Sequence, residues 1–171
     1  MIVDVRSGCS LTMLSEYNKQ QEACMGAYRN ILVAIDFGAG HEQVVERAST
    51  LAATEGAQLG LVHVVEFLHI DLASELVLPQ DVELEAQIVA SARSKLQEIA
   101  VGMHSAQPVS QWVEMGSTKQ EILRVAEEQA VDLIVIGSHG RHGLGRLLGA
   151  TANAILHGAP CDVLAVRIRE T

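Results

Sequence analysis

Short apolar runs alternate with amphipathic segments along most of the chain. The runs that have the length and residue types of strands are 31–35, 59–65, 109–115, 132–136 and 162–166. Between them, apolar residues recur every three or four positions, as they do in helices that bury one face. The helices predicted in this way cover 41–54, 81–101, 118–130 and 147–157. Strands that alternate with helices indicate right-handed crossovers and a parallel sheet.

The predicted fold is therefore α/β: a single doubly wound sheet of five parallel strands with helices on both faces. The run Ile31–Ile35 is apolar at every position, which is typical of a strand covered on both sides. Two helices have well-defined apolar faces that we expect to pack on such a sheet. These faces are Val44, Val45, Ala48, Leu51 and Ala52 in the first helix, and Leu84, Ile88, Ala92, Leu96 and Ile99 in the second.

Residues 1–24 differ from the rest of the chain because they are largely polar and lack a clear period. We interpret them as an N-terminal extension that is either disordered or precedes the native start. The folded domain is expected to cover 25–171. An ordered N-terminal helix is the alternative interpretation of the extension.

Composition excludes several classes of protein. The chain has 171 residues, 49% of them hydrophobic, which is enough for one domain with a core of its own. Its three cysteines are odd in number and widely spaced, so we predict neither a disulfide framework nor a zinc site, and a cytoplasmic location. No signal peptide is recognisable, and no apolar stretch is long enough to span a membrane, so no membrane insertion is expected.

The charge balance argues against nucleic acid as a partner. Twelve Lys and Arg residues stand against 21 Asp and Glu residues, giving a formal charge of −9. Phosphate backbones attract basic surfaces, and base stacking needs aromatic side chains, which make up only 3% of this chain.

One stretch departs from the acidic average. The 29 residues 133–161 contain no carboxylate and carry a formal charge of +2. Within them, the segment 137–149 holds five glycines, and it leads into a predicted helix. Free backbone N–H groups and the positive end of a helix dipole favour anions, so this loop is a candidate phosphate site. The alternative is that the glycines only turn the chain.

The position of a ligand in such a fold can also be predicted. In an open parallel sheet, ligands bind beyond the carboxyl ends of the strands, where the strand order reverses. The residues to inspect are therefore Asp36, after the first strand, and Gly137, after the fourth.

Standard catalytic and metal motifs do not fit this loop. Arg146 and Leu147 stand where a P-loop needs Lys and Ser or Thr. The pair His139 and His142 has no Cys or carboxylate near it in the sequence, so no metal site is predicted from the protein alone. We interpret His63, in a predicted strand, as a hydrogen-bonded core histidine.

Several segments in order resemble the universal stress protein family over about residues 28–169. They are 30–36, 63–65, 132–141, 147–149 and 159–167. The resemblance implies a five-stranded α/β sandwich with the adenine-nucleotide-hydrolase-like, flavodoxin-like strand order 3-2-1-4-5 and homodimers formed through the last strand. In one branch of the family it implies ATP bound by Gly, two residues, Gly, nine residues, Gly, then Ser, Thr or Asn.

The family's nucleotide motif maps onto this chain with two departures. Gly137, Gly140 and Gly149 match the three glycines, but eight residues separate the last two. Ala150 stands at the hydroxyl position, and Thr151 follows it. The resemblance implies ATP or AMP with Mg²⁺ as the ligand, with Asp36 on the ribose or the magnesium ion and Val64 on the adenine. The complete implied set is Asp36, Val64, Ile136, Gly137, His139, Gly140, Arg141, Gly149, Ala150 and Thr151.

The last strand supports a dimer independently of the resemblance. It is apolar and has no proline, so a bare edge here is an aggregation hazard that pairing with a second copy removes. The interface predicted in this way is Val163, Leu164, Ala165 and Val166.

Three functions remain open from the sequence. The first is a dimeric stress-response binding protein regulated by an adenine nucleotide. The second is a nucleotide-free dimeric scaffold that acts through protein partners. The third, a slow ATPase, is disfavoured because no general base is evident near the loop, and no catalytic residue is predicted.

Overall fold

Strands and helices alternate through the computed structural model, which describes residues 28–66, 79–103, 108–138 and 148–168. The elements in chain order are β1 (Asn30–Ala34), α2 (His41–Glu55), β2 (Gln58–Val65), α3 (Pro79–Gly102), β3 (Ser110–Met115), α4 (Thr118–Glu128), β4 (Leu133–Gly137), α5 (Ala150–Gly158) and β5 (Asp162–Val166). The predicted extension, 1–24, and the predicted domain start at Met25 lie outside the described residues.

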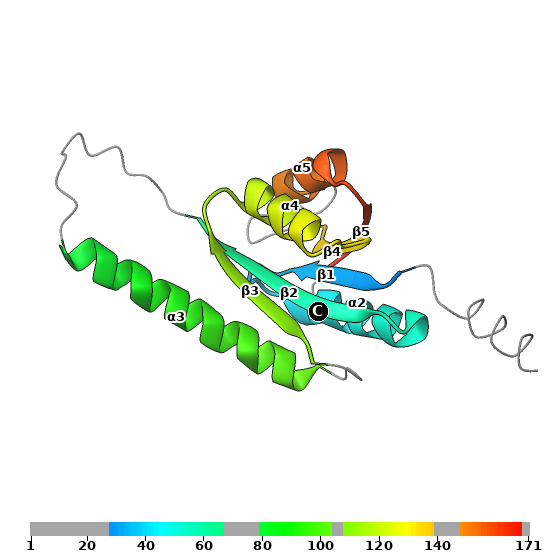
Figure 1. The fold of residues 1–171 in the computed structure, drawn as a ribbon, viewed down its shortest axis with the longest axis horizontal. Helices are drawn as coiled ribbons and strands as arrows, with labels where there is room; N and C mark the ends of the chain where they lie inside the picture. Colours follow the sequence, from blue (N-terminus) through cyan, green and yellow to red (C-terminus); the bar gives the residue numbers. More distant parts are fainter. Residues whose placement is uncertain (1–27, 67–78, 104–107, 139–147, 169–171) are drawn as a thin grey trace, which may run out of the picture.

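The strands form one parallel sheet in the order β3-β2-β1-β4-β5. Helices α2 and α3 cover one face, and α4 and α5 cover the other (Figure 1). The predicted doubly wound fold and its strand order are thereby confirmed. Reversal of the winding direction places β1 and β4 side by side at the centre of the sheet, with Ala34 level with Ile136.

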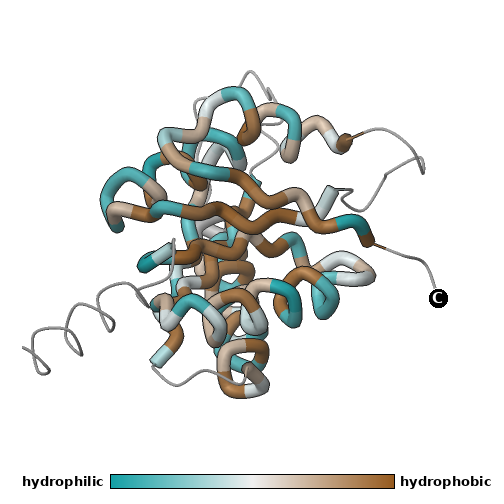
Figure 2. The backbone as a smooth tube through the Cα atoms, turned by 90° about the vertical axis from the view of Figure 1, so that its right-hand side faces the viewer, coloured by the Kyte–Doolittle hydropathy of each residue, from teal (hydrophilic) through white to brown (hydrophobic). Residues whose placement is uncertain are grey.

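Alternation of side chains along β1 divides the apolar core into two layers. Ile31, Val33 and Ile35 pack with α2 and α3, whereas Leu32 and Ala34 pack with α4 and α5. All five side chains are buried, as the continuous apolar run predicted. Figure 2 shows these strands as apolar segments between helices with more polar outer turns.

Element boundaries differ from the predictions by a few residues, for local reasons. Helix α4 ends at Glu128 rather than 130, because Ala130 takes a left-handed conformation with φ 49°. Helix α5 begins at Ala150 rather than 147, since Gly149 before it has extended backbone. Asp132 precedes β4 instead of joining it, and its carboxylate accepts the N–H groups of Arg29 and Asn30 at 2.7 and 3.0 Å.

The predicted apolar face of the second helix is buried only in part. Ala92 and Leu96 are buried, but Leu84 and Ile88 are 57% and 40% exposed. The reason is length: the 24 residues of α3 extend about 36 Å at 1.5 Å per residue, farther than the eight-residue β2 beneath them. The first half of α3 therefore projects past the sheet (Figure 1). Among the described residues, no helix is long and apolar enough to cross a membrane.

A close contact between β2 and β3 fixes the outer part of the sheet. A Cβ added to Gly60 would lie 2.4 Å from Cζ3 of Trp112, so the indole ring rests directly on the β2 backbone. Trp112 in turn packs against the core layer under α4 and α5.

We predict that Gly60→Ala destabilises the fold by about 1–3 kcal/mol, because the extra methyl group forces the indole ring away. Gly102→Ala is the matched control, since a Cβ there meets nothing within 4 Å. Urea unfolding followed by circular dichroism measures both variants. Equal midpoints for the two variants would contradict the packing described here.

Candidate functional site

The candidate site lies at the carboxyl edge of the sheet, where β1 and β4 end together. Ala34 and Ile136 are the level partners at this edge, and β2 lies on the other side of β1. The chain leaves β1 toward one face and β4 toward the other, because α2 and α5 lie on opposite faces. This is the place where strand order reverses and where open parallel sheets bind ligands.

Apolar side chains form a floor beside this edge. Ala34 and Ile136 are buried at 9% and 6% exposure, and the half-buried Val64 packs against the same core layer. All three side chains belong to the face covered by α4 and α5. The structure therefore brings Val64 and Ile136, two of the predicted site residues, onto one face.

Asp36 begins a tight turn after β1. Its side chain is exposed, and Oδ1 accepts the N–H of Gly38 at 2.9 Å. The next residue, Phe37, has a left-handed backbone with φ 54°. Gly40, with φ 88°, precedes α2, and a Cβ there would lie 2.3 Å from Cγ2 of Ile168, beyond β5. The turn is thus packed between β1 and the end of the last strand.

Backbone hydrogen bonds tie the ends of β4 and β5 to the start of α5. Ser138 is buried at 8% exposure, and its N–H donates to the carbonyl of Val166 at 2.7 Å. The N–H of Gly149 donates to the carbonyl of Ser138 at 2.8 Å. Gly137 and Gly149 are thereby drawn to one corner of the molecule.

This arrangement bears on the expected role of the glycine N–H groups. The sequence assigned the N–H of Gly149, with those of the other glycines, to phosphate binding. In the structure, that N–H donates to the carbonyl of Ser138. The first-turn N–H groups of α5, at the same corner, have no partner within their own helix.

The start of α5 has the properties of an anion-binding helix end. Gly149 provides no side-chain cap, and the first turn contains no acidic residue. By contrast, α2 and α4 carry Glu42 and Glu121 in their first turns. Ala150 and Thr151 are both exposed there. The positive end of the α5 dipole is therefore uncompensated by this helix's own side chains.

Three of the predicted site residues, His139, Gly140 and Arg141, lie outside the described residues. So do His142 and Arg146 of the same loop. Within the parts of the chain that the structure describes, no group of three His, Cys, Asp or Glu side chains is arranged to hold a metal ion.

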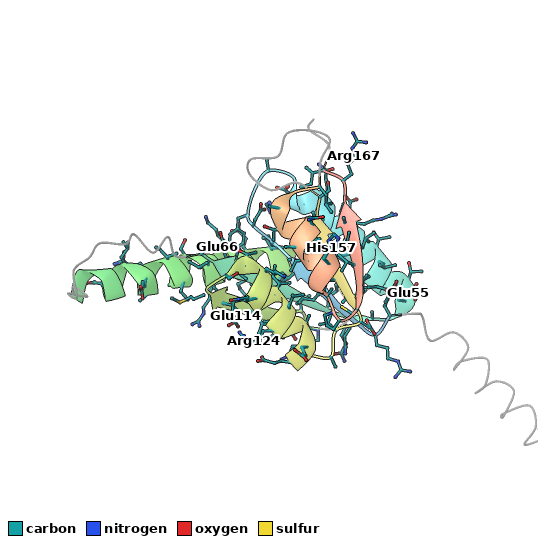
Figure 3. All side chains as sticks on the ribbon, turned by 90° about the horizontal axis from the view of Figure 1, so that it is seen from above. Glu55, Glu66, Glu114, Arg124, His157 and Arg167 are labelled. Carbon is teal, nitrogen blue, oxygen red and sulfur yellow. The ribbon has the colours of Figure 1, made fainter. Side chains whose placement is uncertain are left out.

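Two residues near this edge escaped the sequence-based site. Arg167 is exposed directly after β5 and projects from the molecule in Figure 3. Arg167 is brought to the end of β4 by the hydrogen bond from the N–H of Ser138 to the carbonyl of Val166. No local sequence pattern reveals that bond. The second residue, His63, forms the hydrogen bond expected of it, with Nδ1 2.7 Å from the carbonyl oxygen of Ile35. Because Ile35 directly precedes Asp36, this hydrogen bond links His63 to the turn that carries Asp36.

Acidic side chains at the other end of this edge have structural partners. Glu66, after β2, accepts the N–H of Thr118 at 3.2 Å and also its hydroxyl, so it caps α4. Arg124 of α4 pairs with Glu114, Glu121 and Glu128, and these carboxylates raise its pKa. Figure 3 shows Arg124 and Glu114 close together, apart from Arg167.

A surface groove of about 790 Å³ runs along α2, from His41 at its start, to the end of α3. Val45, Ile99 and Met103 are among its lining residues, and none of the predicted site residues is. The shape of the surface alone therefore favours this groove. The backbone donors and the sheet topology favour the edge between β1 and β4. We base the site on the donors, because a phosphate is held by hydrogen bonds and charge rather than by an apolar groove.

The fold is that of an α/β protein with a doubly wound sheet, and the candidate site lies at its switch point. The model of the universal stress protein family matches residues 27–167. Universal stress protein A homolog 1 of Coxiella burnetii is 42% identical over 145 residues, 84% of this chain and 99% of that protein. Homolog 2 of the same organism is 42% identical over 146 residues, 85% and 99% of the two chains. The chain therefore belongs to the universal stress protein family, which supports a role in stress response.

Solved structures agree on the fold. Hypothetical protein MJ0577 superposes with a TM-score of 0.72 at 24% identity, covering 84% of this chain and 99% of that chain. The universal stress protein UspA from Lactobacillus plantarum gives 0.62 at 28% identity, with 83% and 98% covered. A universal stress protein in complex with cAMP gives 0.56 at 22% identity, with 84% and 100% covered.

Proposed function

We propose that this protein is a cytoplasmic, dimeric stress-response protein that binds an adenine nucleotide, ATP or AMP with Mg²⁺, as a regulatory ligand. The observation that carries the proposal is the start of α5, which has no side-chain cap and no acidic residue in its first turn. It lies at the corner where β4 and β5 end, beside the apolar floor. A helix end of this kind favours a phosphate group.

The parts of a nucleotide fit different parts of this edge. The adenine ring rests on the floor of Val64 and Ile136, and the phosphates accept the first-turn N–H groups at Ala150 and Thr151. Asp36, exposed after β1, accepts a ribose hydroxyl or binds the magnesium ion. The cAMP complex of a relative supports nucleotide as the class of ligand.

Two local features lower the expected affinity without abolishing it. Ala150 offers no hydroxyl, and the N–H of Gly149 is used within the protein. One missing neutral hydrogen bond costs about 0.5–1.5 kcal/mol, which is roughly tenfold in affinity at the upper end. The hydroxyl of Thr151, exposed in the same turn, is the nearest replacement.

We predict that Thr151→Glu lowers the affinity for ATP by at least about tenfold, without any loss of stability in the free protein. A carboxylate in the first turn compensates the helix dipole, which stabilises α5 by about 0.3–1 kcal/mol, but it repels a phosphate placed there. Thr151→Gln is the matched control, because it has the same shape without the charge. Equilibrium dialysis with radiolabelled ATP measures the affinity.

Failure of the wild-type protein to take up ATP at millimolar concentration would overturn nucleotide binding and favour the nucleotide-free scaffold. Equal affinities for Thr151→Glu and Thr151→Gln would place the phosphates away from α5.

The dimer proposed here forms by pairing of β5 with the same strand of a second copy. The carbonyl of Val166 accepts a hydrogen bond from the N–H of Ser138, directly after β4, so the backbone of Val166 faces inward. Backbone direction alternates along a strand, so the N–H and C=O of Ala165 face the open edge, and its side chain is exposed. Such an edge pairs readily with a second strand.

We predict that Ala165→Pro gives a monomer at concentrations where the wild type is a dimer. Proline removes an N–H from the open edge and leaves the inward bonds to β4 in place. Ala165→Val keeps the N–H and is expected to stay dimeric. Light scattering coupled to size exclusion gives the mass, and a dimer for Ala165→Pro excludes pairing through β5.

A further inference from the structure

We propose that His63 is a positioning residue for the nucleotide site: from the opposite face of the sheet, it holds the turn that carries Asp36, and so lets the site recognise ribose hydroxyls. This inference rests on the proposed function for its ligand. Its structural part concerns only the turn after β1.

His63 and the candidate site lie on opposite faces of the sheet. Val64 packs with the layer under α4 and α5, as Ala34 and Ile136 do. Successive side chains of a strand point to opposite faces, so the preceding residue, His63, lies on the side of α2 and α3. Its ring meets Phe37, which packs with that second layer. A ligand on the floor of Val64 and Ile136 is therefore out of its reach.

Both backbone polar groups of Ile35, the residue before Asp36, are hydrogen-bonded to residues of β2. The N–H of Ile35 donates to the carbonyl of Val62 at 2.9 Å, as the parallel ladder requires. Where the β1 ladder ends, Nδ1 of His63 lies 2.7 Å from the carbonyl oxygen of Ile35. The histidine thus donates to the carbonyl oxygen of the peptide bond that joins Ile35 to Asp36.

The residue after Asp36 is held by the same ring. Phe37 has φ 54°, a left-handed conformation that costs free energy for a residue with a Cβ. Its ring lies against the imidazole of His63, with centroids 4.1 Å apart and planes at 35°. The ammonium group of Lys95 in α3 lies 5.6 Å from the centre of the Phe37 ring. This stack stabilises the strained residue from outside the turn.

Asp36 is thereby fixed on both of its sides by one histidine. Within the turn, its Oδ1 accepts the N–H of Gly38 at 2.9 Å, so carboxylate direction and turn conformation depend on each other. Loss of the imidazole frees the carbonyl of Ile35 and exposes the strain at Phe37. The carboxylate then samples other directions, and its hydrogen bond to a ribose hydroxyl weakens.

The test compares ATP with 2′,3′-dideoxy-ATP, which lacks both ribose hydroxyls. We expect the wild type to prefer ATP by about tenfold, the effect of one hydrogen bond to a charged group. His63→Ala is expected to bring this ratio close to one, with dideoxy-ATP affinity within about twofold of wild type. A merely structural defect would lower both affinities together and leave the ratio unchanged.

Two further variants separate positioning from other effects. His63→Asn retains an N–H donor near the place of Nδ1 and is expected to recover part of the ratio. Asp36→Ala is expected to remove the preference by itself, and the double variant Asp36→Ala with His63→Ala should lose no more. Additive losses in the double variant would show that His63 acts without Asp36 and would overturn the inference.

A measurement without nucleotide keeps the two proposals distinguishable. Amide hydrogen exchange at Gly38 reports the bond to Asp36, and we expect it to become about tenfold faster in His63→Ala while the amides of β4 keep their rates. Unchanged exchange at Gly38 contradicts the positioning role even if ATP binds. Faster exchange in a protein that binds no ATP leaves the positioning role standing and overturns the nucleotide site.

Discussion

Burial of β1 and β4 on both faces is the constraint on which the rest of this structure depends. Their side chains are apolar at nearly every position, so neither strand tolerates solvent on either side. The chain meets this requirement by crossing α2 and α3 over one face and α4 and α5 over the other. The change of winding direction then leaves the carboxyl ends of β1 and β4 side by side. The candidate site is a consequence of how the core is covered.

At that edge the chain must find hydrogen-bond partners where the strands stop. The carbonyl of Ile35 is bonded by His63, the N–H of Ser138 donates to the carbonyl of Val166, and the N–H of Gly149 donates to the carbonyl of Ser138. These bonds join segments that lie apart in the sequence. The first turn of α5 is different, because its N–H groups have no partner within their own helix and the turn holds no acidic side chain. In a chain of charge −9, the 29 residues around this turn carry +2, which suits an anion.

The sequence predicted the layers, the strands and the family, because these depend on local periodicity and on the order of short motifs. It also pointed to Asp36 and Gly137 from the predicted strand ends, and to Val64 and Ile136 through the family resemblance; their roles in a ligand site stay predictions. The exposure of Leu84 and Ile88 could not be predicted, because a period defines a helix face but not the length of sheet beneath it. Neither could the use of the Gly149 N–H or the bond from His63 to Ile35, which depend on how the ends of separate strands meet.

The central claim is that the edge between β1 and β4, with the start of α5, is the ligand site of this protein. Titration of ¹⁵N-labelled protein with Mg²⁺ and ATP, followed by amide chemical shifts, tests it most directly. The account predicts saturable shifts at Val64, Gly137, Ala150 and Thr151, while the amide of Gly102 and the indole of Trp112 stay unchanged. Shifts confined to the groove of Val45, Ile99 and Met103, or no shifts at millimolar ATP, would contradict it.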